Sequence, residues 1–279
     1  PNGDWLGDRY AANGSFDLYD YRSDNERRKV DALQTELSGQ IRWAGLQNDV
    51  AVSVMRYRTT LQTQPYAYNW AGTGSVFTPF TSSADPSPVY ANTNRSEYTT
   101  EVSVKDRVTL DTRNSLWLGL RHTRMDRSSV NTDGSSPVHV TPSVTTPWLA
   151  ISHELNNAIL AYGSYGQGVE VDAAPNLPQY SNAGQPLAAL LSKQLAVGIK
   201  QQTGPLRWQM AWFDITRPQS GDSGACSADN SCLRQIDGQT HNRGLELGSS
   251  YGQGPWLLHA SSAWIQSERQ TATIDPSIN

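Results

Sequence analysis

The sequence lacks the long hydrophobic run that would place it among helical membrane proteins. No stretch of about 18 apolar residues is present, as a transmembrane helix requires, and the mean hydropathy is -0.55. Only four Phe and three Met stand beside twelve Tyr and nine Trp. Aromatic rings with a polar edge favour surfaces that are half apolar and half wet, such as the interfaces of a bilayer. These absences exclude a transmembrane helix but allow a membrane-spanning sheet, whose strands need about ten residues with half of them facing lipid.

Basic charge and cysteine are also scarce. The formal net charge of -4 and the pI near 5.7 leave no cationic footprint for a phosphate backbone, so no nucleic-acid partner is predicted. Cys226 and Cys232 are the only cysteines, and the short polar segment between them predicts a loop closed by a disulfide outside the cytosol. The first residues resemble no secretion signal. We therefore expect the chain to be part of a longer exported protein.

The segment 98–110 alternates between apolar and polar side chains with a period of two residues, which predicts a β-strand. Asp106 is the one exception on the apolar parity, and it lies near the end of the segment, where a strand that faces lipid would meet water. The predicted lipid-facing side chains are Val102, Val104 and Val108, and the predicted lumen-facing side chains are Glu101, Lys105 and Arg107.

Short turns and long polar segments alternate along the chain. Five hairpins, hence about ten strands, are predicted around turns at 44–47, 111–114, 154–157, 203–205 and 252–255. Between them the loops are predicted at 60–95, 124–145, 166–190 and 218–239. Loops of this length are uncommon in compact domains, whereas short turns at one rim and long loops at the other are typical of outer-membrane barrels. The fold class predicted is an all-β, antiparallel, up-and-down transmembrane β-barrel.

Tryptophans gather toward the ends of the predicted strands. Such a placement favours two aromatic girdles at the membrane interfaces, and the alternative is that Trp fills the core of a β-sandwich. The residues concerned are Trp43, Trp117, Trp148, Trp208, Trp212, Trp256 and Trp264.

Four stretches resemble one known family in their order and spacing. They are residues 192–200 (SKQLAVGIK), 213–217 (FDITR) and 243–246 (RGLE), with 18–23 (LYDYRS) followed by Arg27 and Arg28. The chain resembles the TonB-dependent outer-membrane receptors, in particular their siderophore-uptake branch. This resemblance implies a 22-stranded barrel of which residues 1–279 form a partial barrel domain, with the plug, the first strands and the last strands absent.

The resemblance also implies a function, a location and partners. We expect a receptor in the bacterial outer membrane for energy-coupled uptake of a ferric siderophore, which is cargo and not a cofactor. Its partners would be that siderophore, outer-membrane lipid, and a TonB-type energy-coupling protein acting through the absent plug. The alternatives are a secreted all-β binding module of carbohydrate-binding type and a porin or adhesin barrel without a plug.

No enzyme signature is present. The five histidines lack metal-ligand spacing, and Gly166 and Gly168 lack the third glycine of a dinucleotide fingerprint. We therefore predict no catalytic residue, no metal and no cofactor. Loop aromatics offer rigid contact area to a chelate with organic arms, and arginine offers planar donors to anionic oxygens. The predicted ligand-binding residues are Tyr66, Tyr68, Trp70, Phe77, Tyr90, Tyr180 and Arg217.

Overall fold

The computed structural model describes residues 11, 13–78, 87, 90–175, 177, 179–226 and 230–274. Every regular element in these residues is a β-strand, and none of them contributes a helix with the length and hydropathy needed to cross a membrane. The strands are β1 (Ser15–Ser23), β2 (Arg27–Trp43), β3 (Leu46–Gln62), β4 (Tyr66–Ser75), β5 (Thr93–Thr109), β6 (Asn114–Asn131), β7 (Val138–Val140), β8 (Ser143–Asn156), β9 (Ile159–Glu170), β10 (Leu190–Thr203), β11 (Leu206–Gly224), β12 (Cys232–Gln253) and β13 (Trp256–Gln270).

Ten of these strands form one path in sequence order. The path is β13-β12-β11-β10-β9-β8-β6-β5-β3-β2, with β7 paired to β6, while β1 and β4 form a separate two-stranded sheet. The path follows the order of the sequence and omits only β4, between β3 and β5, and β7, between β6 and β8. This is the up-and-down arrangement that the five predicted hairpins require. The prediction of ten antiparallel strands is confirmed, and β2 and β13 are the two open edges of the described sheet.

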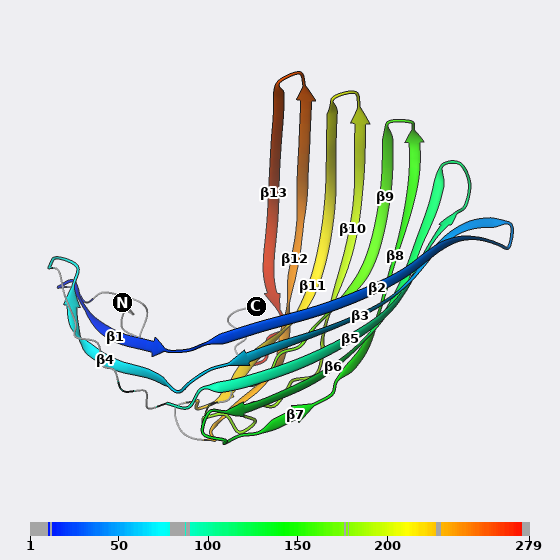
Figure 1. Ribbon diagram of the computed structural model, residues 1–279. Coiled ribbons are helices and arrows are strands. Elements are labelled where there is room, and N and C mark those ends of the chain that lie inside the picture. Colours follow the sequence, from blue (N-terminus) through cyan, green and yellow to red (C-terminus); the bar gives the residue numbers. More distant parts are fainter. Residues whose placement is uncertain are drawn as a thin grey trace. The chain divides into compact units, whose positions relative to one another are not determined.

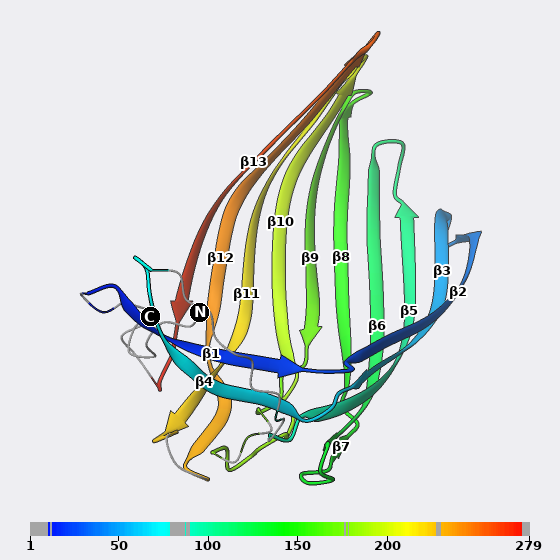
Figure 2. The ribbon, with the colours of Figure 1, turned by 60° about the vertical axis from the view of Figure 1, so that its left-hand side comes forward.

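The chain divides into two compact units. The first contains the described residues of Pro1–Asp31, Arg58–Glu97 and Arg127–His139, and the second contains those of Ala32–Tyr57, Tyr98–Asp126 and Val140–Asn279. In the first unit, β1 pairs with β4 as an antiparallel ribbon (Figure 1). In the second unit, β8 to β13 lie side by side in sequence order (Figure 2).

The hairpin turns of the second unit lie at one end of the sheet (Figure 1), and their residues explain their tightness. Gly204 and Gly254 have φ of 55° and 58°, a region that most residues avoid and that two-residue hairpin turns require. In two other turns a side chain replaces a missing backbone partner. Asp111 Oδ1 accepts from the N–H groups of Arg113 and Asn114 at 2.7 and 2.9 Å, and Asn156 Oδ1 accepts from the N–H of Ala158 at 2.9 Å.

At the opposite end the strands continue beyond the predicted boundaries. β6, β9 and β11 extend into the predicted loops 124–145, 166–190 and 218–239, and β4 lies wholly within the predicted loop 60–95. The predicted loop boundaries were therefore wrong. Alternation of polarity persists only where one face of a strand meets an apolar medium, whereas the hydrogen-bond ladder continues where both faces meet water. Residues 171–189 remain a long connection between strands.

The sheet of the second unit has one polar and one apolar face. Contacts between β3, β5 and β6 define the polar face: Ser53 Oγ lies 2.7 Å from Ser103 Oγ, and Thr123 donates to Glu101 at 3.1 Å. Across the other face runs a cross-strand row of residues without a charged side chain. That row is Leu116, Ile151, Gly163, Val197, Trp212, Leu245 and Trp264.

Two of the tryptophans assigned to girdles lie on the polar face instead. Arg107 places its guanidinium 5.0 Å from the Trp117 ring centroid, and Trp148 packs over Gly119, where an added Cβ would lie 2.0 Å from the indole nitrogen. On β6, Trp117 shares the parity of Thr123 and not that of Leu116. Trp148 of β8 pairs with Gly119, which also has the parity of Thr123. The girdle assignment was therefore wrong for Trp117 and Trp148, because a strand-end position does not decide which face a side chain occupies.

Candidate functional site

A row of stacked tyrosines on the β1–β4 ribbon is the most distinctive surface of the first unit. The Tyr19 and Tyr68 rings are stacked with centroids 5.2 Å apart, and the Tyr21 and Tyr66 centroids are 5.6 Å apart. Tyr66 also stacks on Tyr90 at 5.4 Å. We call these five residues the tyrosine ladder. The contacts form two groups, the stacked Tyr19–Tyr68 pair and the set of Tyr21, Tyr66 and Tyr90, in which the Tyr21 and Tyr66 rings are tilted.

The register of the ribbon explains why the rings meet. Tyr21 pairs with Tyr68 and Tyr19 pairs with Trp70, so alternate residues of the two strands point to the same face. The Tyr90 backbone closes the ladder, since Tyr66 and Tyr90 exchange two N–H to O hydrogen bonds at 2.9 and 3.0 Å. Trp70 extends the face, with its indole N–H donating to Asp17 Oδ1 at 3.2 Å.

Much of this face is open to solvent. Tyr21, Tyr90 and Trp70 are 59%, 47% and 61% exposed. The Tyr68 hydroxyl, by contrast, is enclosed and has no hydrogen-bond partner among the described residues. Aromatic faces of this extent in water mark ligand or partner surfaces more often than structural ones. The ladder can stack against planar groups and can offer phenol hydroxyls as donors or acceptors.

The structure brings together four of the seven residues predicted to bind a ligand. Tyr66, Tyr68, Trp70 and Tyr90 share the face of the ladder. Phe77 follows β4 and lies over Gly14, away from the ladder. The sequence reasoning missed Tyr19 and Tyr21, although their alternation within 18–23 is the same signal as that of Tyr66 and Tyr68 and predicts one shared face.

Tyr180 and Arg217 lie in the second unit, where each is held by a carboxylate. The Tyr180 hydroxyl donates to Asp222 Oδ2 at 3.0 Å, and Arg217 Nε donates to Glu170 Oε2 at 3.0 Å. Burial raises the pKa of Tyr180 above its usual value, and the adjacent Asp222 carboxylate raises it further. Neither residue joins the ladder.

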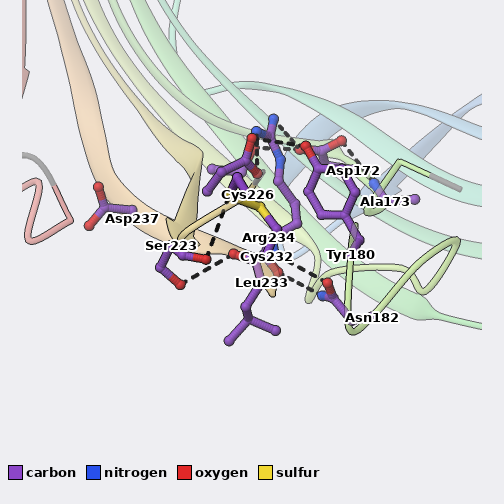
Figure 3. A network of polar contacts seen from close by, with 12 residues as sticks. Asp172, Ala173, Tyr180, Asn182, Ser223, Cys226, Cys232, Leu233, Arg234 and Asp237 are labelled. Atoms are coloured by element: carbon purple, nitrogen blue, oxygen red, sulfur yellow. Dashed lines mark hydrogen bonds and ion pairs between the residues drawn. A yellow bond between two sulfur atoms is a disulfide. The ribbon is translucent and has the colours of Figure 1, made fainter. Parts of the chain in front are cut away.

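Arg234 is the centre of a polar network that ties the 171–189 connection to β11 and β12 (Figure 3). Its guanidinium lies 3.6 Å from Asp172 and 3.1 Å from Asp222. Asn182 accepts from the Arg234 N–H at 3.1 Å and donates to the Arg234 carbonyl at 2.7 Å. The 171–189 connection and β11 therefore both contact Arg234 of β12.

The disulfide lies beside this network. Cys226 and Cys232 are joined in the structure, and the Cys232 backbone accepts from the Ser181 N–H at 2.7 Å and donates to Gln179 O at 2.8 Å. The connection thus runs along the disulfide-closed tip. Because Arg234, Tyr180 and the disulfide act together, we call them the loop clasp.

The protonation of Asp172 is set by the clasp. Burial alone would raise the pKa of this carboxyl, but hydrogen bonds from Ser220 and the Ala173 N–H, with the positive charge of Arg234, lower it below its usual value. Asp172 is therefore ionised at neutral pH, as a partner of Arg234 must be.

The polar face of the second unit carries further charge. Lys105 lies 3.5 Å from Glu36, and Arg107 lies 4.0 Å from Asp49. A hollow of about 260 Å³ on this face includes Glu101, Lys105 and Arg121 in its lining. Among the described residues, no group of three His, Cys, Asp or Glu side chains is placed to hold a metal ion.

Comparison with known protein families identifies the family of this chain. The family described as TonB dependent receptor-like, beta-barrel matches residues 2–278. The chain belongs to the TonB-dependent receptors. A comparison with curated proteins finds no match.

Solved structures agree with the fold of this receptor barrel. The ferric preacinetobactin receptor BauA from Acinetobacter baumannii is 19% identical with a TM-score of 0.70, over 92% of this chain and 39% of that one. The ferripyoverdine receptor of the outer membrane of Pseudomonas aeruginosa is 15% identical with a TM-score of 0.72, over 97% and 37%. The alcaligin outer-membrane receptor FauA from Bordetella pertussis is 16% identical with a TM-score of 0.66, over 94% and 43%.

The chain thus spans about two fifths of the length of these receptors. Membership of the family places the barrel in the outer membrane and sets aside the secreted carbohydrate-binding module. In a barrel wall the apolar face meets lipid and the polar face meets the lumen. Val102 and Val104 lie on the apolar face of the sheet, and Glu101, Lys105 and Arg107 lie on its polar face.

Proposed function

We propose that this receptor barrel serves the energy-coupled uptake of a ferric siderophore, and that the tyrosine ladder with Trp70 contacts the chelate. The family is one of transport receptors and not of enzymes. BauA is the receptor for ferric preacinetobactin, and the Pseudomonas aeruginosa protein is a ferripyoverdine receptor. The ladder is the observation that carries the proposal, because it presents ordered aromatic faces to solvent.

The chemistry of a ferric chelate fits such a surface. Its organic arms present planar or apolar groups around the metal, and each aromatic contact contributes about 0.5–1.5 kcal/mol beyond area burial. Because the rings already stack on one another, little side-chain entropy is lost when a ligand adds to the row.

In this proposal transport is gated and not catalysed. A plug domain, coupled to a TonB-type protein, would move within the lumen while the barrel wall stays fixed. The paired charges of the polar face, such as Glu36 with Lys105 and Asp49 with Arg107, would keep that wall hydrated and ordered against the moving domain.

Binding titrations on the whole receptor test this proposal. A panel of purified ferric hydroxamate, catecholate and carboxylate siderophores is titrated against the wild type, the Tyr66→Ala/Tyr68→Ala variant and a Tyr251→Ala control. The control substitution also removes a tyrosine ring, but at the turn end of β12. We expect saturable binding of one class, weakened about 10- to 100-fold in the double variant and unchanged in the control.

Two outcomes would contradict the proposal in different ways. Saturable binding that is equal in all three proteins would keep uptake but remove the ladder from the binding surface. Passage of small solutes without saturable binding of any chelate would instead indicate a barrel without a plug, of porin or adhesin type, and would refute siderophore uptake itself.

A further inference from the structure

Unpaired cations follow the apolar band on the lipid-facing side of the second unit. On the polar face Lys105, Arg107 and Arg217 each have a carboxylate partner, whereas Lys200 lies over the Tyr162 ring. On the lipid-facing side Lys193 has no hydrogen bond or ion pair with the described residues, and Arg243 contacts only a histidine there. A lipid-facing cation without a counter-ion requires an external one.

The sheet register locates these cations at the edge of the apolar band. The uncharged row ends with Val197, Trp212, Leu245 and Trp264. One step toward the long loops the same strands carry Leu195, Asp214, Arg243 and Gln266, and a further step gives Lys193, Thr216, His241 and Glu268. Polarity therefore changes within two rows, immediately beyond two tryptophans, which is the position of a bilayer interface.

Arg243 is held in place by its neighbours. His241 Nε2 lies 2.7 Å from Asp214 Oδ1, and Arg243 Nη2 lies 3.1 Å from His241 Nδ1. With the proton on Nε2 donated to Asp214, Nδ1 is free to accept from the guanidinium. This contact uses one N–H of Arg243, and the side chain is exposed.

Lys193 extends the same patch. It shares a row with His241, two strands away, so about 10 Å separates their backbones. Both Lys193 and Arg243 are exposed. Their flexible side chains can therefore converge on one anionic group of headgroup size.

Two further strands repeat the change from apolar to cationic. On β6 the exposed Leu118 and Leu120 are followed on the same face by His122 and Arg124. On β3 Val52 and Val54 are followed by Arg56, which lies 5.9 Å from the Tyr98 ring centroid. The position of these cations is thus a property of the rim and not of one strand.

We propose that Arg243, positioned by His241 and Asp214, forms with Lys193 a binding site for the phosphorylated headgroup of a membrane lipid on the outside of the barrel. Guanidinium and phosphate make strong charge-assisted hydrogen bonds. Trp212 and Trp264 lie beside the site to pack against the attached acyl chains. A lipid therefore fits better than a free anion, because it satisfies both the cations and the apolar row below them.

Lipid titrations on the delipidated whole receptor in detergent test the site. Palmitoyl-oleoyl phosphatidylglycerol and phosphatidylcholine are titrated and followed by native mass spectrometry. The variant is Arg243→Gln/Lys193→Gln. The control, Arg207→Gln/Lys200→Gln, removes one Arg and one Lys from the polar face of β11 and β10, where neither forms an ion pair with a described carboxylate.

We expect the wild type to prefer phosphatidylglycerol, and the variant to bind it roughly 10- to 30-fold more weakly, since each cation at an anionic membrane surface contributes several-fold. The control should bind like the wild type. Arg243→Lys, which keeps the charge, should retain most of the binding and shows that loss in the double variant is not misfolding. Equal binding by variant and wild type, or equal loss in variant and control, would overturn the site.

Inorganic phosphate separates the two possible sources of the anion. Millimolar phosphate should displace little bound phosphatidylglycerol, because a free ion makes no contact with Trp212 or Trp264. Displacement of most of the lipid at that concentration would overturn the lipid assignment and indicate a soluble anion. Failure of siderophore binding would leave this test unaffected, since the two surfaces belong to different units.

Discussion

The tyrosine ladder and the loop clasp use the same residue type in opposite ways. In the ladder Tyr21 and Tyr66 contact other rings and leave aromatic faces in water. In the clasp Tyr180 gives its hydroxyl to Asp222, whose carboxylate also holds Arg234. A surface whose polar groups are already paired within the protein offers few contacts to a ligand. An ordered surface with exposed aromatic faces offers more. In the proposed function the ladder contacts a ligand, whereas the clasp holds a loop.

The largest effect on the clasp is expected from Arg234→Met. Removal of the guanidinium leaves Asp172 and Asp222 facing each other, half-buried and without a counter-ion. Removing one partner of a buried ion pair costs about 3–5 kcal/mol, and we expect about 1–3 kcal/mol here because both carboxylates remain partly exposed. Hydrogen exchange at the Ser181 and Cys232 amides should accelerate about 10- to 100-fold. Unchanged exchange would show that the connection is held without Arg234.

Replacing both cysteines by serine should have the next largest effect. The loop closed by Cys226 and Cys232 has a sequence separation of 6, and closing a loop of about seven residues contributes about 2 kcal/mol on the chain-entropy estimate. The rate of amide hydrogen exchange at position 232 should rise about 30-fold, while the affinity of the ladder for the chelate stays constant. A loss of chelate affinity would show that the two regions are coupled.

A matched pair of tyrosine changes sharpens the contrast. Tyr180→Phe removes a hydrogen bond to a carboxylate and should destabilise the clasp by about 1 kcal/mol, seen as roughly fivefold faster exchange at Ser181. Tyr66→Phe removes a hydroxyl that makes no hydrogen bond with the described residues and should leave stability unchanged. If both changes had the same effect, the distinction between a paired and an open region would fail.

Lowering the pH should have the smallest effect on the stability of the loop clasp, and the effect should be gradual. The pKa of Asp172 is lowered in the folded protein by Ser220, Ala173 and Arg234 against the opposing effect of burial. Its contribution to stability is therefore complete above the unfolded pKa of about 3.9 and declines as pH falls through that value toward the lower folded pKa. Proteolysis of the 171–189 connection by an acid-stable protease should rise below about pH 4. Faster cleavage on raising the pH from 5 to 7 would contradict this assignment.

The sequence predicted the hairpins well because local chemistry sets them. Turn residues such as Gly204 and Asp111, with period-two alternation on either side, specify where each strand reverses. The loop boundaries and β4 were not predictable in this way, since polar strands beyond the bilayer have no hydropathy period. The face of Trp117 depended on register with Arg107, and the clasp depended on Arg234 meeting Asp172 from 62 residues away in sequence. Such long-range pairings are not encoded in any local window.

The alternation of lipid-facing and lumen-facing residues is the central claim, and spin labelling of the whole receptor in phosphatidylglycerol bilayers tests it most directly. Nitroxides are attached at Val104→Cys and Ser103→Cys, and at Val197→Cys and Ala196→Cys, with the native cysteines kept in their disulfide. Collision with oxygen, which concentrates in lipid, should be frequent at 104 and 197 and rare at 103 and 196. Equal or reversed collision rates within both pairs would contradict a barrel wall with this orientation.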